Sequence, residues 1–314
     1  MRRGLFVFAV SALLPLVSSY SKSNVYTFAT GGLMGVYYPV GGAVCRLFNL
    51  ADSPDKVKCA VHSTAGSVYN ITSVAAGVDD FGIAQSDKLY NAYNNENVKN
   101  IRSVLSLYKE SVSVVVKNTS NIKTINDFAG KVVNVGAKGS GNRQVADMIL
   151  GEYGVKYASF KRVVDSDYPL AQQQFCKGDV DALIFVAGNP NWLIQELTEK
   201  CNASLISLDS QTIEKIIKKY PFYRQSTIPS GLYYGVNAPV QTIAVESVIF
   251  TSDATSDDAV FKLLKTIFNN LDSFKNSHSL LKSVSQQGIS DDLVVPIHPG
   301  AKRFIETEIK ANKK

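Results

Sequence analysis

Short apolar runs, small polar turns and amphipathic segments follow one another along most of this chain. An apolar run at residues 25–29 predicts a strand, and the spacing of apolar positions over 40–50 predicts a helix. The same order of strand, turn and helix recurs over residues 57–76 and again over 81–93. Repeated units of this kind indicate an α/β fold, in which such turns gather at the carboxyl ends of the strands.

A strongly β-branched stretch at residues 101–117 predicts strands and separates these units from a second block of the same kind. In the second block the pattern predicts strands at 132–136, 182–186 and 203–208 and helices at 127–130, 144–153, 168–176, 192–200 and 212–219. The proline-containing stretch that follows, residues 220–240, is expected to be irregular. The chain then predicts a strand at 242–251 and helices at 257–271 and about 301–310.

Two α/β blocks joined by two strand-like crossings predict a clamshell of two lobes. The crossings fall near residues 112–117 and 242–251, so the C-terminal helices return to the first lobe. We therefore expect a signal segment at 1–21, a first lobe made of 22–113 and 243–314, and a second lobe made of 114–242. A hinge between such lobes allows them to close around a ligand, and five polar turns would face the cleft.

The first twenty residues have the pattern of a secretory signal peptide. Arg2 and Arg3 precede an apolar run over residues 5–17, and small residues follow it. The run is short for a membrane span, although a retained N-terminal anchor is the alternative interpretation. The net charge of +6 falls when the two arginines are removed, and no basic block with interleaved aromatic residues occurs, so nucleic acid is not an expected partner.

Four cysteines lie after the signal segment, where an oxidising compartment would allow disulfides. Four cysteines permit three connectivities. Proximity in the chain favours Cys45–Cys59 and Cys176–Cys201, because each pair then stays within one lobe. The three histidines lie far apart and no Cys/His cluster occurs, so the sequence predicts neither a metal site nor a cofactor.

The Gly-rich turn at residues 30–39 is the first candidate ligand site. Gly31 and Gly32 allow close approach of a ligand to the backbone, and the helix that follows presents free N–H groups that suit an anion. Tyr37 is a candidate for lining the cleft. The alternative is that these glycines only shape a turn and that Tyr37 belongs to the core.

Similar turns follow the other strands and supply the remaining candidates. Ser63, Thr64 and Ser67 are either ligand contacts or helix caps, since serine and threonine favour both roles. Asp87 is expected to cap a helix. Further ligand-binding candidates on these turns are Gln85, Ser140, Gly141, Asn142, Arg143 and Asn189, of which Arg143 is either a partner for a carboxylate or a solvent-facing residue.

Several sequence segments in one order resemble the TAXI family of solute-binding proteins, which serve TRAP transporters. They are TGGLMGVYYPVGGAVCRLFN, STAGSVYNITSVAAGVDDFGIAQSD, the GSGN turn, VDALIFVAGNP, the YPFY and TIP stretch, and VPIHPGAKRF. The resemblance implies a type II periplasmic binding protein, a two-lobed α/β clamshell that acts as a monomer in the periplasm. It further implies capture of a ligand like glutamate, glutamine or 2-oxoglutarate and its delivery to an ion-gradient-driven TRAP permease.

The chain departs from the family pattern at Leu33 and Met34, where small residues are usual, and both are therefore candidates for setting ligand choice. Two other functions compete with solute binding. An exported surface, adhesion or antigenic protein would keep the fold without the cleft. An exported enzyme would need a nucleophile with a base, paired carboxylates or a metal, and no such motif occurs in the sequence, so we expect no enzyme activity.

Overall fold

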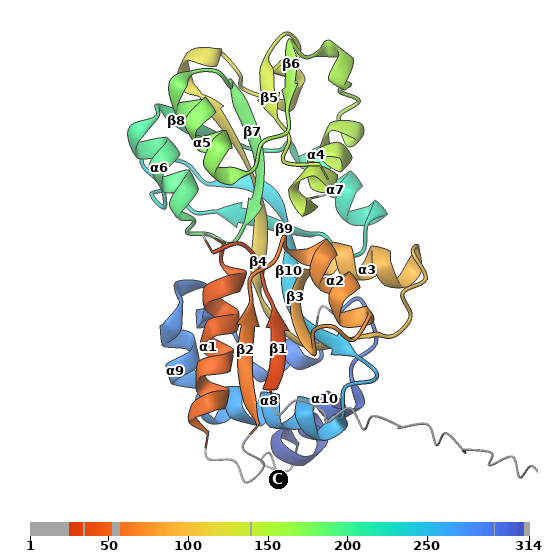
Figure 1. The fold of residues 1–314 in the computed structure, drawn as a ribbon. Coiled ribbons are helices and arrows are strands. Elements are labelled where there is room, and N and C mark those ends of the chain that lie inside the picture. Colours follow the sequence, from red (N-terminus) through yellow and green to blue (C-terminus); the bar gives the residue numbers. More distant parts are fainter. Residues whose placement is uncertain (1–24, 34, 52–56, 139, 292, 311–314) are drawn as a thin grey trace, which may run out of the picture.

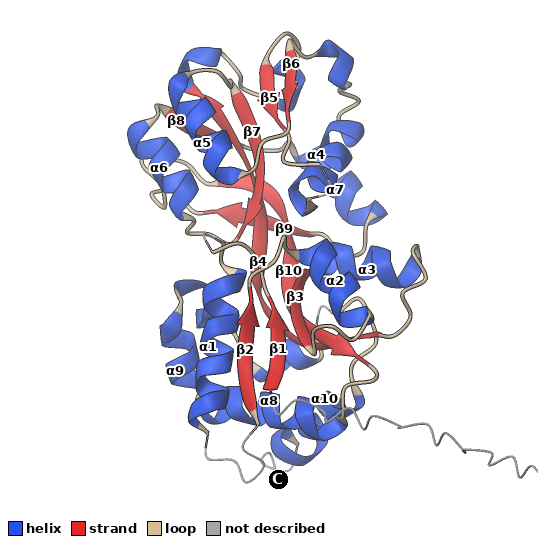
Figure 2. Cartoon of the chain, in the orientation of Figure 1, coloured by secondary structure: helices blue, strands red, loops and turns tan. Residues whose placement is uncertain are grey.

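A twisted sheet runs through both lobes of the molecule and carries helices on its two faces (Figures 1 and 2). The computed structural model describes residues 25–33, 35–51, 57–138, 140–291 and 293–310. Within these residues the sheet has ten strands, in the order β2-β1-β3-β10-β4-β7-β5-β6, with β8 paired to β4 and β9 to β10. The strands are β1 (Val25–Ala29), β2 (Lys58–His62), β3 (Phe81–Gln85), β4 (Ile101–Lys117), β5 (Val132–Asn134), β6 (Arg162–Val164), β7 (Ala182–Ala187), β8 (Ala203–Ile206), β9 (Arg224–Ile228) and β10 (Val240–Ser252).

The helices cover both faces of the sheet in each lobe (Figure 1). The α-helices are α1 (Tyr37–Leu50), α2 (Ser67–Ala75), α3 (Ser86–Asn94), α4 (Gly141–Glu152), α5 (Tyr168–Lys177), α6 (Trp192–Lys200), α7 (Ser210–Lys219), α8 (Asp257–Asn269), α9 (Leu271–Ser277) and α10 (Pro299–Phe304). Short 3₁₀ turns are Asn118–Ser120, Ile125–Phe128, Tyr157–Ser159, Ser279–Ser283 and Gln286–Ile289, and a π turn follows α10 at Ile305–Ile309.

Each lobe has its own hydrophobic core, and β4 and β10 contribute to both. Leu105 of β4 packs in the core of the first lobe, whereas Val114 of the same strand packs in the second. The corresponding residues of β10 are Ile249 and Ile243. These strands pair antiparallel and are nearly continuously buried, which explains their apolar, β-branched sequences. The expected two-lobed α/β fold is confirmed, while the exact division of the lobes at 113/114 and 242/243 stays a prediction, since both positions fall inside these strands.

Several element boundaries differ from the expected ones. Helix α1 begins three residues early, at Tyr37, because Pro39 fits the first turn of a helix, where an N–H has no partner. Strand β9 lies in the stretch expected to be irregular; its polar sequence RQSTI carries no apolar alternation, and its pairing with β10 makes it a strand. The helix expected over 257–271 ends at Asn269, and α9 follows as a separate helix.

The structure forms both favoured disulfides. Cys45 in α1 is bonded to Cys59 in β2, and Cys176 in α5 is bonded to Cys201 after α6. Each bond joins neighbouring elements of one lobe and closes a loop of 14 or 25 residues. Loops of this size stabilise a fold by about 3 kcal/mol through the lower entropy of the unfolded chain.

The N-terminal signal segment lies outside the described residues. Among the residues that are described, no helix has the length and apolar character needed to cross a membrane.

Candidate functional site

A cleft of about 750 Å³ lies between the lobes, where the carboxyl ends of the strands meet the starts of the helices. Most of the candidate residues line it. They are Gly31, Gly32, Leu33, Tyr37, Thr64, Ser67, Gln85, Ser140, Gly141 and Asn142. Met34 lies outside the described residues. The turns that the sequence placed far apart are therefore brought together around one cavity.

Six helices begin at this cleft. The residues that precede α1 to α6 all line it, and they are Val36, Gly66, Gln85, Ser140, Asp167 and Asn191. In the second lobe, each of these residues accepts a hydrogen bond from its own helix, so α4, α5 and α6 are capped. In the first lobe, α1, α2 and α3 have no side-chain cap. Uncapped helix starts present N–H donors and the positive end of the helix dipole to the cleft, and such starts favour anions.

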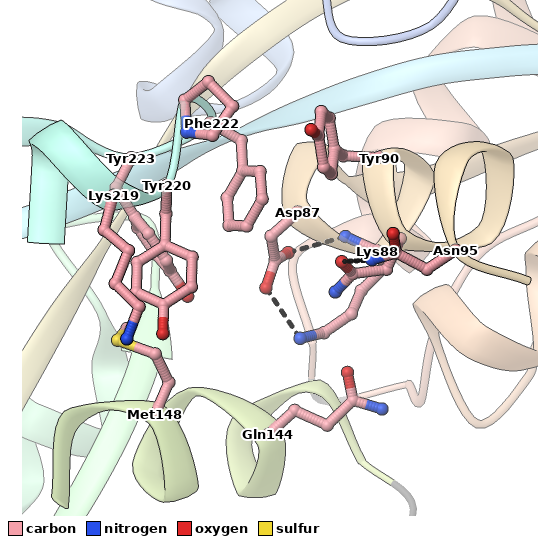
Figure 3. Close-up of a pocket in the computed structure, with 12 residues that line it drawn as sticks. Asp87, Lys88, Tyr90, Asn95, Gln144, Met148, Lys219, Tyr220, Phe222 and Tyr223 are labelled. Carbon is pink, nitrogen blue, oxygen red and sulfur yellow. Dashed lines mark hydrogen bonds and ion pairs between the residues drawn. The ribbon is translucent and has the colours of Figure 1, made fainter. Parts of the chain in front are cut away.

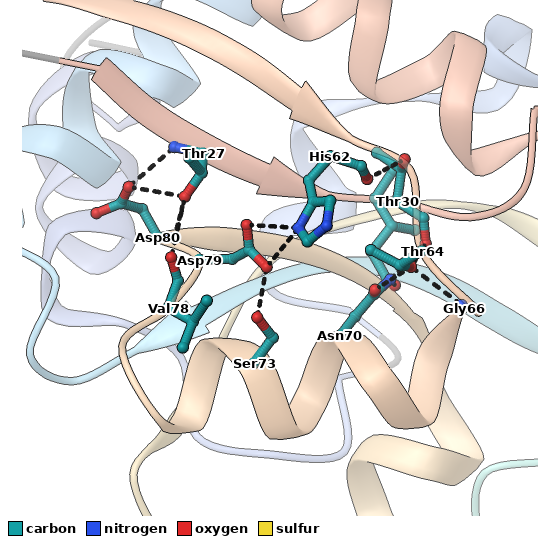
Figure 4. Close-up of polar contacts among 11 residues, drawn as sticks. Thr27, Thr30, His62, Thr64, Gly66, Asn70, Ser73, Val78, Asp79 and Asp80 are labelled. Atoms are coloured by element: carbon teal, nitrogen blue, oxygen red, sulfur yellow. Dashed lines mark hydrogen bonds and ion pairs between the residues drawn. The ribbon is translucent and has the colours of Figure 1, made fainter.

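The turn after β1 is held rigidly by side chains of the first lobe (Figure 4). Asn70 of α2 is fully buried, and its Nδ2 donates to the carbonyl oxygens of Thr30 at 2.5 Å and Ile83 at 2.7 Å. Thr64 Oγ1 also donates to the Thr30 carbonyl, at 3.0 Å, and Ser63 Oγ donates to the Gly31 carbonyl at 3.0 Å. These contacts fix the backbone of the Gly-rich turn against α2.

Of the two roles left open for Ser63, Thr64 and Ser67, the structure does not show the helix cap. Helix α2 is preceded by Gly66, whose φ of 100° suits glycine, and neither Ser63 nor Thr64 caps it. Ser67 is the first residue of the helix, and its Oγ accepts a hydrogen bond from the Gln85 N–H at 3.1 Å. Ser63 holds the turn and is not among the residues that line the cleft.

Glu110 is a lining residue that the sequence reasoning missed. It lies in β4, where this strand passes from one lobe to the other, and it is only 5% exposed. Gln85 Nε2 donates a hydrogen bond to Glu110 Oε2 at 2.8 Å. Burial raises the pKa of the Glu110 carboxyl to about 7; the hydrogen bond from Gln85 and the adjacent Tyr37 hydroxyl oppose this rise, and the nearby carboxylates Asp87 and Glu246 add to it. The available signal was the one acidic residue in a long strand made mainly of apolar residues and serines.

Tyr37 places a hydroxyl group beside this carboxyl. Its oxygen is buried, faces Ser67 and Glu110, and makes no hydrogen bond of normal geometry with the described residues. Burial and the adjacent Glu110 raise the pKa of the Tyr37 hydroxyl, so this group stays protonated as a donor.

The two lobes touch at the start of α4. A Cβ atom at Gly141 would lie 2.5 Å from Gln85 Oε1 and 3.3 Å from Lys88 Cε, so a larger residue here would have to displace the end of the Gln85 side chain. The neighbouring Asn142 is buried, and its Oδ1 accepts a hydrogen bond from the Val186 N–H at 2.9 Å while its Nδ2 donates to the Tyr168 hydroxyl. Asn142 therefore fixes α4 against β7 and holds Gly141 at the contact between the lobes.

Besides Ser63, two further candidates, Arg143 and Asn189, do not line the cleft. Arg143 Nε donates to Asp147 Oδ1 at 3.0 Å, four residues along α4, and its guanidinium lies 4.9 Å from the centre of the Tyr157 ring. These contacts hold the Arg143 side chain on the outer surface of α4. Asn189 Oδ1 accepts a hydrogen bond from the Tyr233 hydroxyl, which ties it to a loop of the second lobe. The structure thus gives both residues structural contacts away from the cavity.

A second cavity of about 250 Å³ lies between α3, α4 and the segment after α7 (Figure 3). Asp87 and Lys88 lie at its α3 wall and form an ion pair of 2.6 Å, in which both side chains are buried. The expectation that Asp87 caps α3 is wrong, because Asp87 is the second residue of the helix and its Oδ1 accepts a hydrogen bond from the Lys88 N–H. Figure 3 shows Gln144 of α4 on the side of this pair and Met148 of the same helix beside Lys219 and Tyr220.

The mouth of the large cleft carries two exposed apolar side chains, Leu33 at 65% and Trp192 at 38% exposure. Leu33 is one of the two positions at which the sequence departs from the TAXI pattern. Across the described residues, no group of three or more His, Cys, Asp and Glu side chains is arranged to hold a metal ion.

The fold is the two-lobed α/β fold of periplasmic-binding-protein-like structures. The chain belongs to the NMT1-like family, whose model matches residues 28–307.

Solved structures of low sequence identity share this fold. One is a protein from Bordetella bronchiseptica RB50, with a TM-score of 0.56 and 13% identity over 90% of this chain and 98% of that one. Another is the periplasmic aliphatic sulphonate binding protein SsuA from Escherichia coli, with a TM-score of 0.52 and 12% identity over 91% and 79% of the two chains. A third is a putative L-cystine ABC transporter from Listeria monocytogenes, with a TM-score of 0.50 and 14% identity over 82% and 96%.

Proposed function

We propose that this chain is an exported solute-binding protein that captures a small carboxylate between its lobes and performs no chemistry on it. The observation that carries the proposal is the set of three uncapped helix starts, α1, α2 and α3, around the cleft of about 750 Å³. A cleft of this size suits a small molecule, and the free N–H groups suit its anionic end.

The resemblance to the TAXI family extends the proposal to transport. On this proposal, the signal segment at 1–21 directs the chain to the periplasm, and the ligand-loaded monomer delivers its solute to a TRAP permease in the membrane. Glutamate, glutamine and 2-oxoglutarate are the ligands that this family relationship favours. Ten lining candidates, from Gly31 to Asn142, form the proposed site together with Glu110 and Trp192.

Thermal unfolding tests the proposal. The mature chain should be stabilised by at least one acid from a panel of glutamate, glutamine, 2-oxoglutarate and C4 to C6 dicarboxylates. A ligand at a hundred times its Kd adds about 2.7 kcal/mol to the free energy of unfolding. Short alkanesulfonates serve as the comparison, because a structurally similar protein, SsuA, binds aliphatic sulphonates. Stabilisation by sulfonates alone would contradict the carboxylate ligand, and no stabilisation by any member would favour a surface protein that binds no small solute in its cleft.

A further inference from the structure

We propose that the solute is a zwitterion of the amino-acid type and that the carboxylate of Glu110 binds its ammonium group. This inference rests on the proposed function. It narrows the range of expected ligands to acids that also carry an ammonium group.

The first observation is that Glu110 is a buried acid without a cationic partner. It lines the cleft, is only 5% exposed, and forms no ion pair with any lysine or arginine of the described residues. The carboxylates Asp87 and Glu246 are the charged groups that act on Glu110. Lys88 does not compensate Glu110, because its ammonium group forms an ion pair with Asp87. A buried carboxylate among like charges needs either a proton or a cation.

The hydrogen bonds of Glu110 leave room for a ligand. Gln85 supplies one donor to Oε2, and the Tyr37 hydroxyl faces the carboxyl without completing a bond of normal geometry. A carboxylate has about four acceptor positions. An ammonium group carries three N–H donors and is the cation that complements such a site best.

The second observation is that anion-binding groups adjoin this carboxyl. Tyr37 is the first residue of α1, Ser67 is the first of α2, and Gln85 directly precedes α3. The Gln85 amide donates to Glu110, and the Tyr37 hydroxyl faces both Glu110 and Ser67, so Tyr37 links the carboxyl to the start of α2. One tyrosine side chain therefore spans the space between Glu110 and the uncapped start of α1. The negative end of a small zwitterion would lie at the helix starts and its positive end at Glu110.

The titration of Glu110 supports the same assignment. In the absence of ligand, burial raises the pKa of its carboxyl to about 7, so the group holds a proton for much of the time at neutral pH. An ammonium ion would replace this proton as the compensating charge, and a proton would leave to solvent on binding. A purely structural Glu110 would release none.

The test compares matched ligands on wild type and Glu110→Gln by calorimetric titration. L-glutamine is paired with its analogue without the amino group, glutaramate, and L-glutamate is paired with glutarate. We expect wild type to bind each amino acid at least tenfold more tightly than its partner. In Glu110→Gln this preference is lost, mainly because the amino acids bind more weakly. Titrations at pH 6.5 in buffers of different ionisation enthalpy should show proton release on binding by wild type and none by the variant.

Glu246→Gln is the matched control. Glu246 is a buried acid of the neighbouring strand β10, accepts a hydrogen bond from Ser106 Oγ at 3.2 Å, and does not line the cleft. This variant should keep the preference for the amino acids. Equal binding of glutamine and glutaramate by wild type, or an unchanged preference in Glu110→Gln, would overturn the inference while the carboxylate site stands. Failure of every acid to bind would overturn the proposed function and this inference with it. If Glu110→Gln does not fold, the inference is tested on wild type alone, by its preference for the amino acids over their analogues and by its proton release on binding.

Discussion

Replacing Gly141 by alanine is expected to weaken ligand binding roughly ten- to hundredfold without unfolding the second lobe. The added Cβ would lie 2.5 Å from Gln85 Oε1, and Gln85 is held in place by its hydrogen bond to Glu110. Either the lobes stay further apart or Gln85 leaves Glu110, and both changes damage the cleft. Overpacking of this kind costs about 1–3 kcal/mol, which corresponds to the stated loss of affinity.

Gly151→Ala on the same helix is the control for this change. A Cβ at Gly151 meets no atom within 4 Å, so the variant should bind ligand as wild type does and gain slightly in helix stability. Calorimetric titration of the two variants with the acid that stabilises wild type gives the comparison. Equal affinities for Gly141→Ala and Gly151→Ala would show that the contact between Gly141 and Gln85 plays no part in binding.

At pH 8, the ligand-free Glu110→Gln variant is expected to be more stable than wild type. Folding raises the pKa of this carboxyl from 4.5 to about 7, so the folded chain holds a proton that the unfolded chain releases. The contribution of Glu110 to the stability of wild type is therefore fully present below pH 4.5, is lost as the pH rises towards 7, and is absent above that range. The full shift corresponds to about 3 kcal/mol, and glutamine carries none of this cost because it does not ionise.

Urea unfolding of both proteins at pH 5 and pH 8 measures this difference. The difference in free energy of unfolding, variant minus wild type, should increase by up to about 3 kcal/mol between the two pH values. A difference that does not change with pH would mean that Glu110 ionises in the folded chain as it does in the unfolded one. The expected result would show that the cleft keeps an acid that costs stability, as binding sites commonly do.

The repeated order of strand, turn and helix was enough to predict the two lobes and to locate most of the cleft. Parallel units place their turns at one edge of the sheet, so Gly31, Ser67, Gln85 and Gly141 could be assigned to a common site before their positions were known. Their separate roles could not be assigned in the same way. Ser63 and Thr64 hold the turn by hydrogen bonds to backbone carbonyls, and short hydroxyl side chains serve this role, a cap and a ligand contact equally well.

Glu110 was missed because strand periodicity identifies burial and says little about chemistry. Its immediate neighbours in β4 are Lys109 and Ser111, and most of the strand is apolar. The strand passes between the lobes beside β10, a partner that is distant in the sequence. For Arg143, the sequence itself indicated a structural contact instead of a ligand contact. Asp147 follows it by four residues, a spacing that places an acid and a base side by side on a helix, and the structure shows that pair.

The most direct test of the proposed cleft uses its tryptophan. Trp192 is the only tryptophan of the sequence and lines the mouth of the cleft with 38% of its surface exposed. Titration of the acid that stabilises the mature chain should change the intrinsic fluorescence in a saturable, one-to-one manner, with a Kd that matches calorimetry. Trp192→Phe should bind the same acid and lose the signal. An acid that stabilises the protein and leaves the emission of Trp192 unchanged would place the ligand elsewhere and contradict a binding site between the lobes.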